Sequence, residues 1–193
     1  MTFEIFLVFF LSYLLGSIPF GLILTKIFLN KDIRKVGSKN IGATNVLRAG
    51  NKFIAAITLL LDIMKGCVPI LVTKYFFQDL IYLSGLMVFL GHIFPVWLKF
   101  KGGKGVATYL GIILALSFKF GIIFGVTWLL ITFIFKYSSL ASMISALIVF
   151  AYSIILDNNT LSVFLFITFI IILYTHRENI VRLKDSKETK IKL

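Results

Sequence analysis

Long runs of apolar residues dominate this chain and restrict what it can fold into. A helix needs about 20 consecutive apolar residues to cross the hydrocarbon core of a bilayer, and somewhat fewer when polar flanks reach the headgroups. Hydrophobic residues make up 59% of the 193 residues and charged residues only 15%, which is too little polar surface for a soluble domain. The sequence therefore predicts an all-α, polytopic integral membrane protein that forms a single domain over residues 1–193.

Seven of the apolar runs qualify as transmembrane helices. The fourth run is short, and only Lys119 separates it from the fifth, so six spans is the alternative topology. The seven predicted spans cover residues 4–25, 53–73, 80–98, 106–118, 120–135, 140–156 and 161–175.

The basic residues predict the orientation of these spans, because cytoplasmic loops of membrane proteins are enriched in Lys and Arg. With seven spans, Lys74 and Lys119 fall on one side, Lys65 lies inside the second span, and all other basic residues fall on the opposite side. This bias places the N-terminus outside and the C-terminus in the cytoplasm. The net charge of +12 has the same origin and suits anionic membrane lipids, and no motif indicates binding to nucleic acid.

The first polar cluster is "GSKNIGATNVLRAG", residues 37–50. Ser38, Asn40, Asn45 and Arg48 offer hydrogen-bonding groups among glycines, which let backbone N–H groups approach a ligand. The guanidinium fork of Arg48 matches the geometry of phosphate oxygens. The cluster therefore indicates an anion-binding loop, with an ordinary polar loop at the membrane surface as the alternative.

The second cluster is "GHIFPVWLKFKGGKGVATYLG", residues 91–111. Lys101 and Lys104 flank Gly102 and Gly103, and His92 precedes them at the end of the third span. The segment lacks the spacing of a nucleotide-binding P-loop, but a lysine between glycines reaches a phosphate with little steric obstruction. The alternatives are a basic turn that follows the positive-inside bias and a histidine that only bridges helices.

The third cluster is "THRENIVRL" at the inner end of the last span. His176 and Asn179 share one face of a helix, which Arg182 continues, and Ser142 in "KYSSLAS" adds a hydroxyl group. These groups also suit phosphate, although an interfacial face whose long side chains reach the headgroups is the alternative.

Two charged residues, Asp62 and Lys65, lie inside the second span. Charges within a membrane are costly and usually functional. Because the two residues are three positions apart, we prefer the interpretation that they form an ion pair on one helix, in which each side chain neutralises the charge of the other.

The three clusters resemble, in order and spacing, the signature segments of the bacterial acyl-phosphate:glycerol-3-phosphate acyltransferases. The likeness also includes "YLLGSIPFG", "LDIMKGCVPI" and "YSSLAS", so it extends over nearly the whole chain. Lys39 departs from the family pattern, which usually has glycine there.

The resemblance implies a seven-span enzyme of the bacterial inner membrane with its active site on the cytoplasmic side. It would transfer a fatty acyl group from acyl phosphate to glycerol 3-phosphate, giving lysophosphatidate and phosphate, as the first step of phospholipid synthesis. By resemblance, the residues that bind glycerol 3-phosphate are Ser38, Arg48, Lys104, Ser142, His176 and Asn179.

Together, these arguments predict a set of site residues and no cofactor or metal. We expect catalytic roles for His92, Lys104 and His176. We expect substrate binding by Ser38, Asn40, Asn45, Arg48, Lys101, Gly102, Gly103, Ser142 and Asn179. The proton acceptor is His92, His176 or a substrate phosphate. The alternative functions are a transporter of phosphate or an organophosphate, and a headgroup-binding protein without catalysis; no protein partner is indicated.

Overall fold

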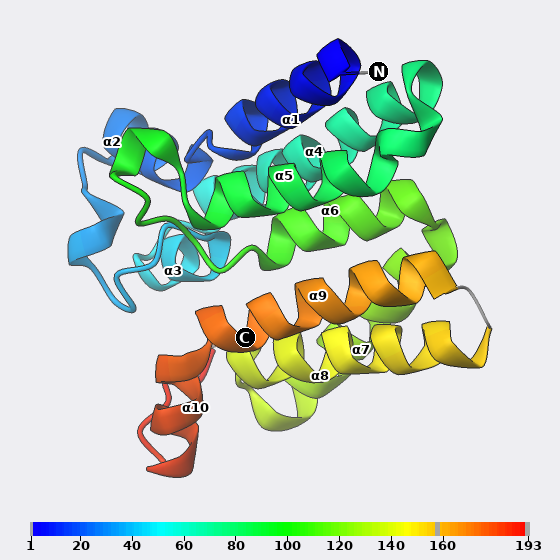
Figure 1. The fold of residues 1–193 in the computed structure, drawn as a ribbon. Coiled ribbons are helices and arrows are strands. Elements are labelled where there is room, and N and C mark those ends of the chain that lie inside the picture. Colours follow the sequence, from blue (N-terminus) through cyan, green and yellow to red (C-terminus); the bar gives the residue numbers. More distant parts are fainter. Residues whose placement is uncertain (1, 157–158, 192–193) are drawn as a thin grey trace. The chain divides into compact units, whose positions relative to one another are not determined.

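The computed structural model describes residues 2–156 and 159–191, and its regular structure there is helical (Figure 1). This confirms the all-α class. The chain divides into two compact units, Met1–Leu116 and Ser117–Leu193. A single domain over residues 1–193 stays a prediction.

In the first unit, long apolar helices lie side by side, with α4 along α6 and α1 along α5 (Figure 1). Its helices are α1 (Thr2–Gly16), α2 (Phe20–Leu29), α3 (Ala43–Arg48), α4 (Lys52–Phe76), α5 (Ile81–Ile93) and α6 (Val106–Leu116). Short 3-10 turns lie between them: η1 (Ile33–Lys35), η2 (Gln78–Leu80) and η3 (Val96–Leu98).

Glycines allow these helices to pack closely. A Cβ atom on Gly66 of α4 would overlap the backbone oxygen of Thr108 on α6. In the same way, a Cβ atom on Gly16 of α1 would overlap the backbone oxygen of Val88 on α5. Small residues at helix contacts are typical of membrane proteins, where association depends on close packing.

The first predicted span, residues 4–25, is not one continuous helix. Helix α1 ends at Gly16, α2 begins at Phe20, and Pro19 lies in the break between them. Proline lacks a backbone N–H group and disfavours the helical conformation of the residue before it, which accounts for the interruption. Taken together, Thr2–Leu29 still has the length and hydropathy of a membrane span.

The second unit contains α7 (Phe118–Phe135), α8 (Ser138–Ile155), α9 (Asn159–Thr175) and α10 (Arg177–Lys184). Helix α8 packs against both α7 and α9. The chain bends by 59° between α9 and α10. The predicted spans 120–135, 140–156 and 161–175 therefore correspond to α7, α8 and α9.

In the described residues, five segments are long and apolar enough to cross a membrane, or six if α9 and α10 are counted as one bent span. The five are Thr2–Leu29, Lys52–Phe76, Gln78–Leu98, Phe118–Phe135 and Ser138–Ile155. The short fourth run forms α6, an apolar helix of 11 residues. These lengths support a multi-pass membrane protein, while the number of seven spans and their orientation stay predictions.

Candidate active site

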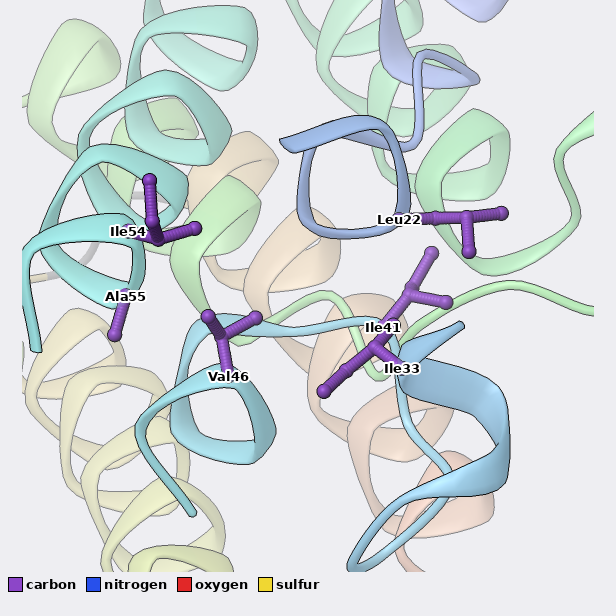
Figure 2. Close-up of a cluster of buried hydrophobic side chains, with 6 residues drawn as sticks. All are labelled: Leu22, Ile33, Ile41, Val46, Ile54 and Ala55. Carbon is purple, nitrogen blue, oxygen red and sulfur yellow. The ribbon is translucent and has the colours of Figure 1, made fainter. Parts of the chain in front are cut away.

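A cluster of buried apolar side chains supports the first two signature segments in the first unit. Figure 2 shows its six members, which come from α2, η1, α3, α4 and the segment before α3. They are Leu22, Ile33, Ile41, Val46, Ile54 and Ala55. Leu98 of η3 packs against the same cluster. The cluster therefore holds residues 37–50 and the segment after α5 at one end of the unit (Figure 1).

Asn45 organises the first signature segment from within. Its side chain is 1% exposed, and its Oδ1 accepts a hydrogen bond of 2.8 Å from the backbone N–H of Ser38. Its Nδ2 lies 2.8–3.1 Å from the backbone oxygens of Ile33, Val36 and Asn40. These contacts assign Asn45 to shaping the loop, and its direct contact with substrate stays a prediction.

The other predicted ligands of this segment lie on the surface of the loop that Asn45 shapes. Ser38 is exposed, whereas Asn40 and Arg48, the last residue of α3, are half-buried. Lys39 has a left-handed backbone with φ of 60°. This conformation favours glycine, which is consistent with the glycine that the family resemblance implies at this position.

Arg34 near this loop is already paired. Its guanidinium donates to both carboxylate oxygens of Asp32, at 2.9 and 2.7 Å. These hydrogen bonds lower the pKa of Asp32 well below its ordinary value. The pair is partly exposed to solvent, and Asp32 neutralises the charge of Arg34.

The glycine–lysine loop, residues 99–105, folds back onto the end of α5. The backbone N–H of Gly102 donates to the oxygen of Ile93 at 3.0 Å, and that of Gly103 donates to the oxygen of His92 at 3.1 Å. A Cβ atom on Gly103 would overlap Nε2 of His92. Glycine is therefore required for this approach, which places Lys104 directly after the contact.

His92 is enclosed between helices. The residue is 4% exposed, and its Nδ1 lies 3.1 Å from Oγ1 of Thr108 on α6. The same nitrogen lies 3.9 Å from Oδ1 of Asp62 on α4. The bridging role that the sequence left open is therefore present, and a catalytic role for His92 stays a prediction.

The predicted pair of intramembrane charges is confirmed. Nζ of Lys65 lies 2.8 Å from Oδ1 of Asp62, and both side chains are 3% exposed. Sequence spacing indicates this contact, but it does not reveal that the pair also faces His92. That link depends on how α4 and α5 pack.

In the second unit, His176 precedes α10 at the bend and is 2% exposed. Its Nδ1 lies 2.8 Å from the backbone oxygen of Ile172, which can only accept a hydrogen bond. The neutral ring therefore carries its hydrogen on Nδ1, which leaves the lone pair on Nε2. This tautomer can accept a proton or a hydrogen bond through Nε2.

Asn179 and Arg182 share one helical face, as predicted, and both bind Glu188 in the C-terminal tail. Nδ2 of Asn179 donates to Oε1 at 2.7 Å, and Nε of Arg182 donates to Oε2 at 2.8 Å. The hydroxyl of Ser139 also donates to Oε1, at 3.1 Å. Burial of the carboxylate opposes its ionisation, but these hydrogen bonds outweigh burial and lower the pKa of Glu188.

Sequence reasoning missed Glu188. The residue lies in a polar tail without apolar periodicity, and it has several charged neighbours in the sequence. The only available signal was its position a few residues after the third signature segment. The structure gives it a side chain that is 4% exposed.

The hydroxyl group of Ser142 already makes two hydrogen bonds within the second unit. Its hydroxyl donates to the backbone oxygen of Ser138 at 2.7 Å, which is the helical back-bond expected of serine. Nε1 of Trp128 on α7 donates to the hydroxyl oxygen of Ser142 at 3.1 Å. Any contact of Ser142 with substrate would use its remaining acceptor capacity.

The predicted site residues thus form two groups, one in each unit. The first group is Ser38, Asn40, Asn45, Arg48, His92, Lys101, Gly102, Gly103 and Lys104. The second group is Ser142, His176 and Asn179. The first group combines hydrogen-bond donors with the cations of Arg48, Lys101 and Lys104, which suits an anionic ligand, whereas the second group supplies polar side chains and a histidine.

Comparison with known proteins gives consistent results. A family model described as glycerol-3-phosphate acyltransferase matches residues 6–186. The chain is 56% identical over 182 residues to a glycerol-3-phosphate acyltransferase of Pelagibacter ubique, covering 94% of this chain and 95% of that protein. It is 50% identical over 191 residues to the protein of that name from Mesorhizobium japonicum, covering 99% and 98%.

The fold is similar to solved structures as well. One is the glycerol 3-phosphate form of PlsY (YgiH), described as an integral membrane glycerol 3-phosphate acyltransferase. Its TM-score is 0.93 at 36% identity, and the alignment covers 98% of this chain and 96% of that chain. The lysophosphatidic acid form of PlsY (YgiH) gives a TM-score of 0.89 at 35% identity, covering 97% and 95%.

Proposed function

Because the chain belongs to the glycerol-3-phosphate acyltransferase family, we propose that it transfers a fatty acyl group to glycerol 3-phosphate with acyl phosphate as the donor. A hydroxyl oxygen of glycerol 3-phosphate forms the new ester bond with the acyl carbon. The bond from that carbon to the phosphate oxygen breaks, and phosphate leaves with the electron pair. The products are lysophosphatidate and phosphate, in the first step of bacterial phospholipid synthesis.

The observation that carries this proposal is the fixed glycine–lysine loop. Both substrates are anions, so bringing them together needs positive charge that is already in place. The contact between Gly103 and the buried His92 fixes the backbone next to Lys104. A preorganised cation of this kind stabilises charge as it develops on a leaving phosphate. Acyl phosphate is an activated donor, so positioning and charge neutralisation supply most of the remaining catalysis.

We assign the remaining roles from exposure and hydrogen bonding. In the first unit, Ser38, Asn40, Arg48 and Lys101 bind substrate oxygens, and Asn45, Gly102 and Gly103 shape the loops that present them. In the second unit, Ser142 and Asn179 bind substrate, and His176 offers the lone pair on Nε2. Because Nδ1 of His92 contacts Thr108 and its Nε2 lies against Gly103, we favour His176 or a substrate phosphate as the proton acceptor.

We further propose seven spans in the bacterial inner membrane, with the N-terminus outside and the active site on the cytoplasmic side. The distribution of Lys and Arg supports this orientation. Cys67 is the single cysteine, so a Cys67→Ser background allows labelling at chosen positions. Cysteine at Asp79 should react with an impermeant reagent applied outside, and cysteine at Lys187 should not. The reverse pattern would contradict the orientation. Asp157, a second predicted outer position, lies outside the described residues.

The direct test uses purified protein in detergent with acyl phosphate and glycerol 3-phosphate. We expect phosphate release and lysophosphatidate formation in equal amounts. Acyl-CoA should react slowly or not at all, because its phosphates lie far from the thioester carbonyl. Equal rates with both donors would contradict the proposed donor. Transport of phosphate into proteoliposomes without acyl transfer would favour the transporter alternative.

A further inference from the structure

We propose that Asp62 and Lys65 are positioning residues for acyl transfer, which act through the His92 ring on the glycine–lysine loop. This proposal rests on the proposed function of that loop. It assigns a role to two buried charges that the proposed chemistry does not otherwise use.

The contacts of Lys65 exceed what charge neutralisation requires. Its ion pair with Asp62 at 2.8 Å already compensates both charges. Its Nζ also donates to the backbone oxygen of Ile18 at 2.7 Å and lies 5.5 Å from the centre of the Phe20 ring. Ile18 and Phe20 adjoin Pro19 in the break between α1 and α2. Lys65 therefore connects α4 to the point where the first span is interrupted.

The other member of the pair faces His92. Oδ1 of Asp62 lies 3.9 Å from Nδ1 of His92, and Oγ1 of Thr108 lies 3.1 Å from the same nitrogen. These two contacts approach the ring from α4 and α6, while the ring itself belongs to α5. The orientation of the imidazole is therefore set by three helices.

The opposite edge of the ring supports the loop. Nε2 occupies the space that a Cβ atom on Gly103 would need, so the ring and the loop are in direct contact. The backbone N–H of Gly103 is held by the oxygen of His92 at 3.1 Å, and Lys104 follows immediately. A rotation of the ring would displace Gly103 and, with it, the cation that we assign to the leaving phosphate. A misplacement of about 1 Å in an active site can reduce the rate about 10²-fold.

Replacing both Asp62 and Lys65 by neutral residues distinguishes a positioning role of the pair from a pair that only neutralises its own charges. The single variants Asp62→Asn and Lys65→Met each leave one buried charge uncompensated, whereas the double variant leaves none. We expect the double variant to keep a melting temperature near that of the native protein and to lose kcat about 10-fold or more, on the scale of a misplaced catalytic group. Recovery of the native kcat in the double variant would show that the pair only neutralises itself, and would overturn the proposal.

A second pair of variants tests whether the effect passes through His92. In a His92→Gln background, Asp62→Asn should reduce kcat by less than about 2-fold further, because residues that act in one chain are not additive. If the two substitutions lowered kcat by factors that multiply, the proposal that Asp62 acts through His92 would be overturned. Thr108→Val removes the other ring contact without changing any charge. It should lower kcat in the same direction, and a native rate would contradict the role of the ring.

Tryptic cleavage of the loop gives a readout that does not depend on acyl transfer. The bonds after Lys99, Lys101 and Lys104 should be cut several-fold faster in Thr108→Val and in the double variant than in the native protein. Lys74→Met and Asp79→Asn, at exposed positions of the same unit that are distant in sequence from the loop, are the charge-changing controls, and their loops should be cut at the native rate. Unchanged cleavage in both test variants would overturn the proposal. If the native protein turned over no acyl phosphate, the proposed donor would fail while the cleavage rates still decided the positioning role.

Discussion

Replacement of Glu188 by Gln should destabilise the second unit far more than its place in a polar tail suggests. The carboxylate accepts hydrogen bonds from Ser139, Asn179 and Arg182, and its side chain is 4% exposed. Gln keeps the size of the side chain but replaces one acceptor oxygen by an NH₂ group. Because all three neighbours present donors, that NH₂ group would face at least one of them.

The structure allows the magnitude to be bounded. A hydrogen bond to a charged group contributes about 1.5–3 kcal/mol, and a buried donor left unsatisfied costs about 1–3 kcal/mol. Arg182 is 37% exposed, so water replaces part of its lost interaction. We therefore expect a loss of about 2–4 kcal/mol in the free energy of unfolding. For a protein of this size, 1 kcal/mol corresponds to about 2–4 °C in Tm.

Thermal unfolding in detergent at pH 7 measures this loss, with Glu178→Gln as the matched control. Glu178 carries the same charge one helical turn from Arg182, at 3.7 Å, but its side chain is 76% exposed. Exposed ion pairs contribute about 0–1 kcal/mol, so the control should hardly change Tm. Equal shifts in Tm for the two variants would refute the reasoning, because burial of the Glu188 carboxylate would then be irrelevant.

The effect of Glu188→Gln should also depend on pH. The pKa of Glu188 is lower in the folded protein than in the unfolded chain. Its stabilisation is therefore complete above the ordinary glutamate pKa of about 4.3 and is lost as the pH falls through the folded value. The difference in Tm between native protein and variant should shrink over this acidic range. A constant difference would show that the charge of Glu188 contributes little.

Three further predictions concern the substrates. Arg48→Lys keeps the charge but loses the guanidinium fork, so steady-state kinetics should show a large rise in the KM for glycerol 3-phosphate; an unchanged KM would exclude a bidentate contact. Lys104→Ala should lower kcat about 10²-fold or more, on the scale of a lost oxyanion donor, and full activity would mean that the loop is only a basic turn. His176→Ala should lower kcat about 10²–10⁴-fold if His176 is the general base; a loss of only a few-fold would leave a substrate phosphate as the proton acceptor.

The sequence predicts the helices well because the spans are encoded locally, as uninterrupted apolar runs. Five of the seven predicted spans pass the length and hydropathy criteria, α9 passes only together with α10, and α6 forms as a short helix where the fourth run was expected. The break before α2 was missed because residues 17–19 are flanked by apolar residues on both sides and hydropathy averages over them. Pro19 was the available signal, and its effect depends on partners such as Lys65 that accommodate the interrupted backbone.

The residues of the candidate site could be predicted from the sequence, but the contacts that each of them makes could not. The signature segments identified the polar residues, yet their hydrogen-bond partners come from tertiary packing. Asn45 was predicted as a ligand, and its contacts instead connect backbone groups of its own loop. His92 meets Asp62 only because α4 and α5 lie together in the fold. Glu188 reaches Asn179 because the tail folds back, which a polar sequence does not indicate.

The contact between His92 and Gly103 leads to a final prediction about a single methyl group. Gly103→Ala adds a Cβ atom that would overlap Nε2 of the ring, while the ring is enclosed by Thr108 and Asp62 and cannot simply rotate away. The loop must move instead, and Lys104 moves with it. We expect kcat to fall about 10-fold or more, with a smaller effect on Tm, because the added methyl group displaces the loop but removes no buried side chain.

Gly125→Ala on α7 is the control, since a Cβ atom there meets nothing within 4 Å. Alanine has a higher helix propensity than glycine by about 1 kcal/mol, so this variant should be as stable as the native protein or more stable, with native kinetics. The comparison isolates the steric effect, because both variants make the same chemical change. Native kcat in Gly103→Ala would show that the loop accommodates the methyl group without displacing Lys104, and the assignment of this cation to the leaving phosphate would lose its structural basis.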